Sequence, residues 1–120
     1  MSNSKSASNH YIAQRLTAVL LIPISIWFIV FIFKISQADS AMEVFRYIKS
    51  PFNTITAMIF IITFLYHGFL GIKEIVTDYV HCPTQKKIIM SSLVLFTFVS
   101  CVAGVFSIAY IYIKLRLFPF

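Results

Sequence analysis

Three long apolar runs most constrain what this chain of 120 residues can fold into. They cover residues 16–33, 52–72 and 88–113, and none of them contains Asp, Glu, Lys or Arg. A helix needs about 20 apolar residues to cross a bilayer core, whereas the strands of a membrane barrel alternate in polarity and have only about ten. The sequence therefore predicts an all-α membrane protein with three transmembrane helices.

Composition agrees with this class. The mean hydropathy is +0.87, and hydrophobic residues make up 59% of the chain, against about 45–50% in soluble domains. The net charge of +6 comes from Lys and Arg residues that flank the apolar runs, which indicates anchoring to lipid headgroups rather than nucleic-acid binding. The two cysteines, Cys82 and Cys101, lie far apart along the expected helices, so we expect free, structural thiols.

We expect a single membrane-anchor domain over residues 1–120, with approximate spans at 12–34, 52–79 and 87–114. The first helix should begin near His10 or Tyr11 and bend at Pro23. Residues 41–48 read as a short surface helix, and Ser50 and Pro51 should start the second spanning helix.

At the far end of the second helix, Pro83 should stop its extension, and Lys86 with Lys87 should mark the entry to the third. Three crossings place the termini on opposite sides, but each side carries five basic residues, so charge alone does not orient the chain. The Ser-rich tail lacks Arg and is short for an organelle presequence, and no convincing cleavage site follows the first run. These features favour a bacterial inner membrane.

One histidine lies deep within the second apolar run. In a continuous helix, His67 and Asp78 lie about 16 Å apart along the axis and about 20° apart in projection, with Gly71 and Glu74 near the same line. A polar group in hydrocarbon is costly and marks a candidate functional site. Spacing leaves three interpretations open: an axial haem ligand, a proton relay, or an imidazole that hydrogen-bonds across a helix contact beside packed glycines.

Other polar residues gather where the second helix should meet water. Tyr79 could donate a hydrogen bond to a quinone, with Asp78 beside it, or could be an ordinary interfacial tyrosine. Arg15, at the mouth of the first helix, could pair with haem propionates or with lipid phosphates. His10 could join Arg15 or be solvated, and Trp27 reads as a lipid-facing or core residue.

The second-helix motif resembles a known family. The run His67-Gly68-Phe69-Leu70-Gly71, followed by Thr77-Asp78-Tyr79-Val80, is similar to the small hydrophobic membrane anchor of bacterial succinate dehydrogenase, the D-type cytochrome b subunit of respiratory complex II. The segment Ala13-Gln14-Arg15-Leu16-Thr17-Ala18 looks like the entrance of its first helix. The resemblance covers most of the chain in topology, but only the second-helix motif is specific.

The resemblance implies site residues and orientation. His67 would be an axial ligand of a haem b shared with a sister anchor subunit, and Tyr79 with Asp78 would belong to a ubiquinone site. Arg15 would hold a haem propionate, and His10 is a weaker candidate for the same role. The amino terminus and Tyr79 would face the cytoplasm.

The resemblance also implies a function. The chain would be a non-catalytic subunit that anchors an iron–sulfur subunit and a flavoprotein subunit, packs with the sister anchor into a bundle, and helps pass electrons from succinate to ubiquinone. Alternatives are the anchor of a quinol:fumarate reductase, and a haem-free, holin-like or assembly protein with three spans. The sequence has no Gly-rich dinucleotide loop and no Cys cluster for iron–sulfur binding, so that chemistry would belong to partners.

Overall fold

The computed structural model describes residues 2–118 of the chain, with side chains from residue 4 onward. Four helices follow one another: α1 (Ser2–Ser36), α2 (Ala41–Ile48), α3 (Pro51–Tyr79) and α4 (Pro83–Leu117). Three of them are long and apolar enough to cross a membrane, over Ser4–Ser36, Pro51–Tyr79 and Pro83–Leu117. The predicted all-α fold with three spanning helices is confirmed.

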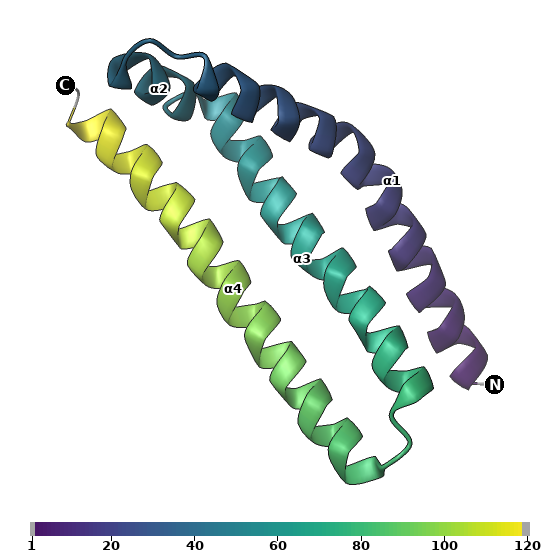
Figure 1. Cartoon of the computed structure of the whole chain (residues 1–120). Coiled ribbons are helices and arrows are strands. Elements are labelled where there is room, and N and C mark those ends of the chain that lie inside the picture. Colours follow the sequence, from purple (N-terminus) through teal and green to yellow (C-terminus); the bar gives the residue numbers. More distant parts are fainter. Residues whose placement is uncertain (1, 119–120) are drawn as a thin grey trace.

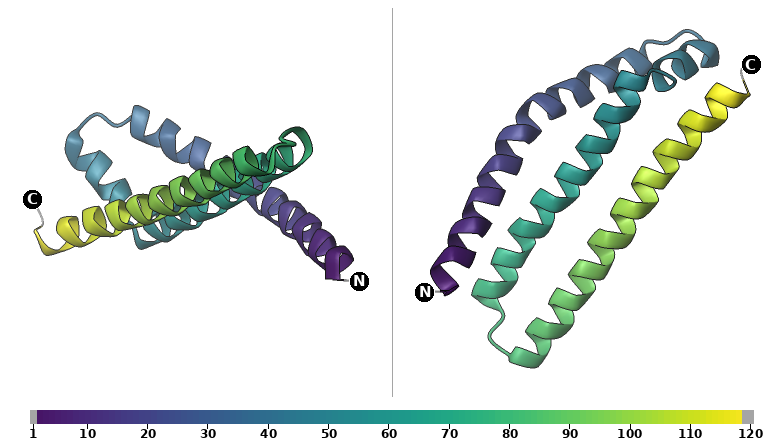
Figure 2. Two further views of the ribbon diagram at one scale, coloured as in Figure 1. Left: turned by 90° about the horizontal axis from the view of Figure 1, so that it is seen from below. Right: turned by 180° about the vertical axis from the view of Figure 1, so that it is seen from behind.

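The three long helices lie side by side with α3 in the middle, packed against α1 on one side and α4 on the other (Figures 1 and 2). The molecule measures 57 × 26 × 23 Å. Because a helix of 35 residues is about 52 Å long, α1 and α4 extend beyond a hydrocarbon core of about 30 Å. Because α1 and α4 pack on different sides of α3, the chain forms an open layer of helices rather than a closed bundle.

Prolines and a serine cap set most of the helix starts. Pro51 and Pro83 each occupy the first turn of a helix, where the missing N–H has no intrahelical role. Ser40 caps α2, and its hydroxyl accepts a hydrogen bond from the Glu43 N–H at 3.3 Å. The surface helix at residues 41–48 and the start of α3 at Pro51 lie where the sequence places them.

Two helix starts differ from expectation. Helix α1 begins at Ser2 rather than near His10, because the polar tail continues the same helical backbone. Helix α4 begins at Pro83 rather than at Lys86. Pro83 is thus the first residue of α4, and α3 has already ended at Tyr79. Lys86 lies in the first turn of α4, and its Nζ donates to the Thr77 carbonyl at 3.2 Å, which links the end of α3 to α4.

Helix α1 is bent partway along its length (Figures 1 and 2), and it contains Pro23, the residue at which the sequence predicts a bend. Proline removes one helical hydrogen bond, and its ring crowds the preceding turn, which is a common cause of such bends. On the carboxyl side of the bend, Trp27 Nε1 donates to Asn53 Oδ1 at 3.3 Å, and Asn53 Nδ2 donates to the Tyr47 carbonyl at 2.9 Å. Trp27 and Asn53 thus join α1, α2 and α3 at one corner.

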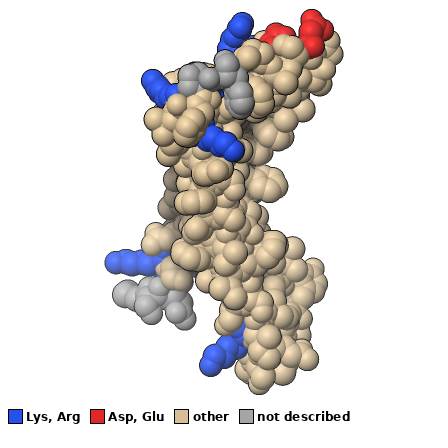
Figure 3. All heavy atoms as spheres, turned by 90° about the vertical axis from the view of Figure 1, so that its left-hand side faces the viewer, with Lys and Arg blue, Asp and Glu red and all other residues tan. Residues whose placement is uncertain are grey.

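The chain buries little of itself. The buried hydrophobic side chains of the described residues are Ile24, Leu70, Val76 and Leu115. At most 11% of the most apolar window of any spanning helix is buried. On the face in Figure 3, charged side chains gather at the two ends and none appears in the middle. This wide uncharged band is suited to contact with lipid or with other membrane subunits.

Candidate functional site

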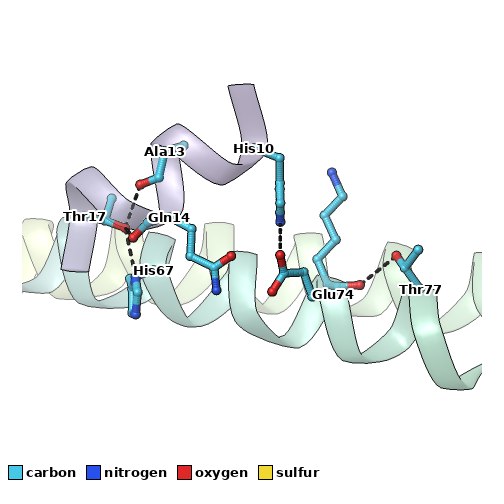
Figure 4. A network of polar contacts seen from close by, with 8 residues as sticks. His10, Ala13, Gln14, Thr17, His67, Glu74 and Thr77 are labelled. Atoms are coloured by element: carbon cyan, nitrogen blue, oxygen red, sulfur yellow. Dashed lines mark hydrogen bonds and ion pairs between the residues drawn. The ribbon is translucent and has the colours of Figure 1, made fainter. Parts of the chain in front are cut away.

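The site is built around the imidazole of His67, which is half-buried in the middle of α3 and faces α1. Its Nδ1 lies 2.9 Å from the hydroxyl oxygen of Thr17, fifty positions earlier in the chain (Figure 4). The ring is thus held toward α1 rather than turned outward into the bilayer. The predicted hydrogen bond across a helix contact is present, and it restricts the ring without using its second nitrogen.

Thr17 also bonds to its own helix. Its Oγ1 lies 2.8 Å from the Ala13 carbonyl oxygen and 3.0 Å from that of Gln14 (Figure 4). A hydroxyl has one proton to donate and two lone pairs that accept. One threonine side chain therefore connects the imidazole to the backbone of α1.

The second nitrogen of His67, Nε2, points away from α1 (Figure 4). The described residues provide no hydrogen-bond partner for it. Next to this histidine, a Cβ atom added to Gly68 or Gly71 would meet nothing within 4 Å. The idea that these glycines pack against another helix is therefore wrong within this chain, and the positions that their side chains would occupy are open.

Closer to the membrane surface, three side chains meet between α1 and α3. His10 Nε2 lies 3.3 Å from Glu74 Oε1, a close imidazole–carboxylate contact without the alignment of a hydrogen bond (Figure 4). The Gln14 amide, oriented with its nitrogen toward Glu74, donates to the two carboxylate oxygens at 2.9 and 3.1 Å. His10, Gln14 and Thr17 thus form one stripe on α1 that faces His67 and Glu74 on α3.

The amino-terminal part of α1 and the carboxyl-terminal part of α3 form an open cavity of about 440 Å³. Asp78 lines it, but Tyr79 does not; the Tyr79 side chain is 78% exposed at the last residue of α3. Asp78 and Tyr79, which the sequence interpretation assigns to one site, therefore face different surroundings in the structure. The residues around the cavity are Ser6, Ala7, His10, Tyr11, Lys73, Glu74, Thr77 and Asp78.

Arg15 lies near this cluster but outside it. Its guanidinium carbon lies 5.1 Å from the centre of the Tyr11 ring, a cation–π arrangement on the exposed side of α1. No carboxylate of the described residues lies within ion-pair distance of Arg15. Arg15 is thus free of a partner carboxylate, whereas His10 already faces Glu74.

Thr17 and Gln14 are the site residues that the sequence interpretation missed. The signal was present: His10, Gln14 and Thr17 follow a spacing of four and three, which places them on one helix face. His67 and Glu74 are seven residues apart on α3, which also places them on one helix face. The sequence could therefore have suggested that the polar stripe on α1 pairs with the polar stripe on α3. What no single stripe reveals is which helix it faces.

The described residues contain no metal site of the usual kind, which needs a group of at least three His, Cys, Asp or Glu side chains. A lone imidazole with a free nitrogen instead suits a macrocycle that brings its own donor atoms. Fold and site together define a membrane-embedded subunit with three spanning helices, an open lateral surface and one polar seam.

Comparison with known proteins identifies the family. The family described as "Succinate dehydrogenase/Fumarate reductase transmembrane subunit" matches residues 1–106. The succinate dehydrogenase hydrophobic membrane anchor subunit of Rickettsia bellii (strain RML369-C) is 31% identical over 108 residues, which cover 90% of this chain and 86% of that protein. The protein of the same name from Rickettsia prowazekii (strain Madrid E) is 33% identical over 109 residues, 91% of this chain and 86% of that protein.

No solved structure matches the chain. The chain belongs to the succinate dehydrogenase/fumarate reductase transmembrane subunit family, as its second-helix motif predicts.

Proposed function

We propose that this chain is the small membrane anchor of a succinate:quinone oxidoreductase, and that His67 supplies one axial ligand to a haem b shared with a sister anchor subunit. The observation that carries the proposal is the orientation of the His67 ring. Its Nδ1 lies 2.9 Å from the Thr17 hydroxyl oxygen, and its Nε2 points away from α1 without a partner among the described residues. An imidazole held by one nitrogen and open at the other is prepared for an axial metal bond.

The surroundings of His67 fit a flat cofactor. Gly68 and Gly71 leave open space where other residues would place side chains. Arg15, which has no carboxylate partner among the described residues, would bind a propionate through charge-assisted hydrogen bonds. His10 is a weaker candidate because its Nε2 faces Glu74. A bound haem would supply a one-electron carrier within the membrane.

Tyr79 and Asp78 are our candidates for the ubiquinone site. The exposed Tyr79 hydroxyl would donate a hydrogen bond to a quinone carbonyl, from the surface of α3 where a partner subunit can complete the pocket. Asp78, on the wall of the neighbouring cavity, would exchange protons with water there. The two side chains would thus serve separate tasks at one membrane surface.

The partners follow from the same proposal. The chain would be a non-catalytic subunit of the bacterial inner membrane, with its amino-terminal side in the cytoplasm against the iron–sulfur subunit. The flavoprotein subunit would carry out the succinate chemistry, and the sister cytochrome b anchor would cover the open face of the helix layer and provide the second haem ligand. Family membership favours this function over a holin-like protein, and the names of the relatives favour succinate dehydrogenase over fumarate reductase.

The test is to purify the complex with His67→Ala and, as a matched control, with His81→Ala. His81 lies in the exposed α3–α4 connection, outside the spanning helices. We expect His67→Ala to abolish the reduced haem b absorption per flavin, and His81→Ala to leave it unchanged. Retention of the full haem signal in His67→Ala would refute the ligand assignment.

A further inference from the structure

We propose that Thr17 is a positioning residue for His67: its hydroxyl oxygen accepts a hydrogen bond from Nδ1–H and so fixes the ring tautomer that has its free electron pair on Nε2. This inference rests on the proposed haem function. It adds to that function a residue on a different helix, which acts on the iron only through the imidazole.

The hydroxyl geometry favours this direction of the hydrogen bond. The Thr17 Oγ1 is 2.8 Å from the Ala13 carbonyl and 3.0 Å from the Gln14 carbonyl, and both of these oxygens can only accept. The single hydroxyl proton is best used toward Ala13, which leaves the oxygen lone pairs for a donor. The atom 2.9 Å away on the other side is Nδ1 of His67, which can be that donor.

The opposite tautomer leaves a polar group without a partner. If Nδ1 accepted the hydroxyl proton, Nε2 would carry the other hydrogen and point away from α1, where the described residues provide no acceptor. An unpaired N–H in an apolar environment is costly, whereas an electron pair at Nε2 is available to a metal. The arrangement with Nδ1–H donating therefore leaves no N–H group of His67 without an acceptor.

The hydrogen-bond chain should also affect the electronic properties of the ligand. It runs from Nδ1–H to the Thr17 hydroxyl and on to the Ala13 carbonyl, and bonds in such chains strengthen one another. A stronger bond from Nδ1–H makes the imidazole a better electron donor to a metal at Nε2, which stabilises the oxidised iron. Removing the hydroxyl should thus raise the midpoint potential of the haem and weaken its retention.

The experiment compares the intact complex carrying Thr17→Val, Thr17→Ser or Thr56→Val with the wild type. Valine keeps the shape of threonine without the hydroxyl, and serine keeps the hydroxyl. Thr56 is the matched control, because its hydroxyl makes the same bond four residues back, to Phe52 at 2.7 Å, without a side-chain partner. Haem per flavin, the midpoint potential in redox titration and the reduced absorption spectrum are measured, none of which depends on turnover.

We expect Thr17→Val to raise the midpoint potential and to weaken haem retention about 10- to 100-fold, the range for lost partners of metal-bound histidines. Thr17→Ser and Thr56→Val should resemble the wild type. A wild-type potential and haem content in Thr17→Val, with haem still lost in His67→Ala, would overturn the role of Thr17 and leave the ligand assignment standing. Equal defects in Thr17→Ser and Thr17→Val would also overturn it, because the hydroxyl would not be the cause. Full haem content in His67→Ala would overturn both proposals.

Discussion

At the scale of single residues, the membrane makes each polar side chain conspicuous. His67 lies in an apolar helix, and its two nitrogens have different surroundings: Nδ1 lies 2.9 Å from the Thr17 hydroxyl, whereas Nε2 has no hydrogen-bond partner among the described residues. Closer to the surface, Glu74 is shared by His10 and Gln14. A polar group without a partner is costly in hydrocarbon, so this asymmetry at His67 supports the proposed haem ligation.

Tyr79 offers a prediction at this scale. Tyr79→Phe removes one hydroxyl from an exposed ring at the end of α3, so folding should be unaffected. If the hydroxyl donates to ubiquinone, its loss should lower the rate of quinone reduction by up to about tenfold, the value of one hydrogen bond. The measurement is succinate-driven quinone reduction compared with succinate oxidation by an artificial acceptor that bypasses the membrane subunits.

The matched control is Tyr110→Phe, a change of the same kind at an exposed tyrosine of α4. This variant should retain both activities. An equal loss of both activities in Tyr79→Phe would contradict a role at the quinone and would point to damage of the whole complex.

At the scale of helices, α3 packs against its two neighbours in different ways. Its contact with α1 includes the polar seam, whereas its contact with α4 includes a close approach at Gly104. A Cβ added to Gly104 would lie 3.1 Å from Cγ2 and 3.3 Å from Cδ1 of Ile61. Small residues permit such approaches between membrane helices. Of the three glycines, this one lies at a tight contact inside the chain, and Gly68 and Gly71 do not.

Gly104→Val should therefore destabilise the α3–α4 contact by about 1–3 kcal/mol through overpacking against Ile61. Valine is no worse than glycine in a helix, so the loss can be assigned to the contact. The measurement is the temperature at which the purified complex dissociates in mild detergent.

Gly68→Val gives the opposite expectation. No atom lies within 4 Å of its added Cβ, so helix packing inside the chain should be unchanged while the haem content falls. Two results would contradict this division of roles: a lowered dissociation temperature for haem-loaded Gly68→Val, or an unchanged dissociation temperature for Gly104→Val.

At the scale of the molecule, the chain buries little of its own surface. Its helices form a layer with α3 in the middle, and most of each spanning helix is exposed (Figures 1 and 2). Lipid tails can cover this apolar surface at little cost, but they offer no polar or metal group to Nε2 of His67. In the proposed complex, the haem would take that nitrogen and the sister anchor would pack against the open side of the layer.

We therefore expect the chain to be less resistant to proteolysis when it is produced without the sister anchor subunit. Membranes with and without that subunit are treated with protease, and the lifetime of the full-length chain is compared. Co-production of His67→Ala with the sister subunit separates the effect of haem from that of helix contacts. Equal lifetimes with and without the sister subunit would contradict the prediction.

The sequence by itself determined the number of spanning helices, the short surface helix at residues 41–48, a bend in α1 and the place of His67 within an apolar spanning helix. The physical reason is that each of these depends on local properties. In hydrocarbon the backbone must satisfy its own hydrogen bonds, so length and apolar content alone specify a helix. The same local motif around His67 also indicated the family.

The tertiary structure alone decided which groups meet. Three contacts depend on how the helices are rotated against one another. Thr17 contacts His67, and Gln14 and His10 both contact Glu74. The close helix contact lies at Gly104 rather than at Gly68 or Gly71. That rotation is set by side-chain packing between segments distant in the chain, and no single helix contains it.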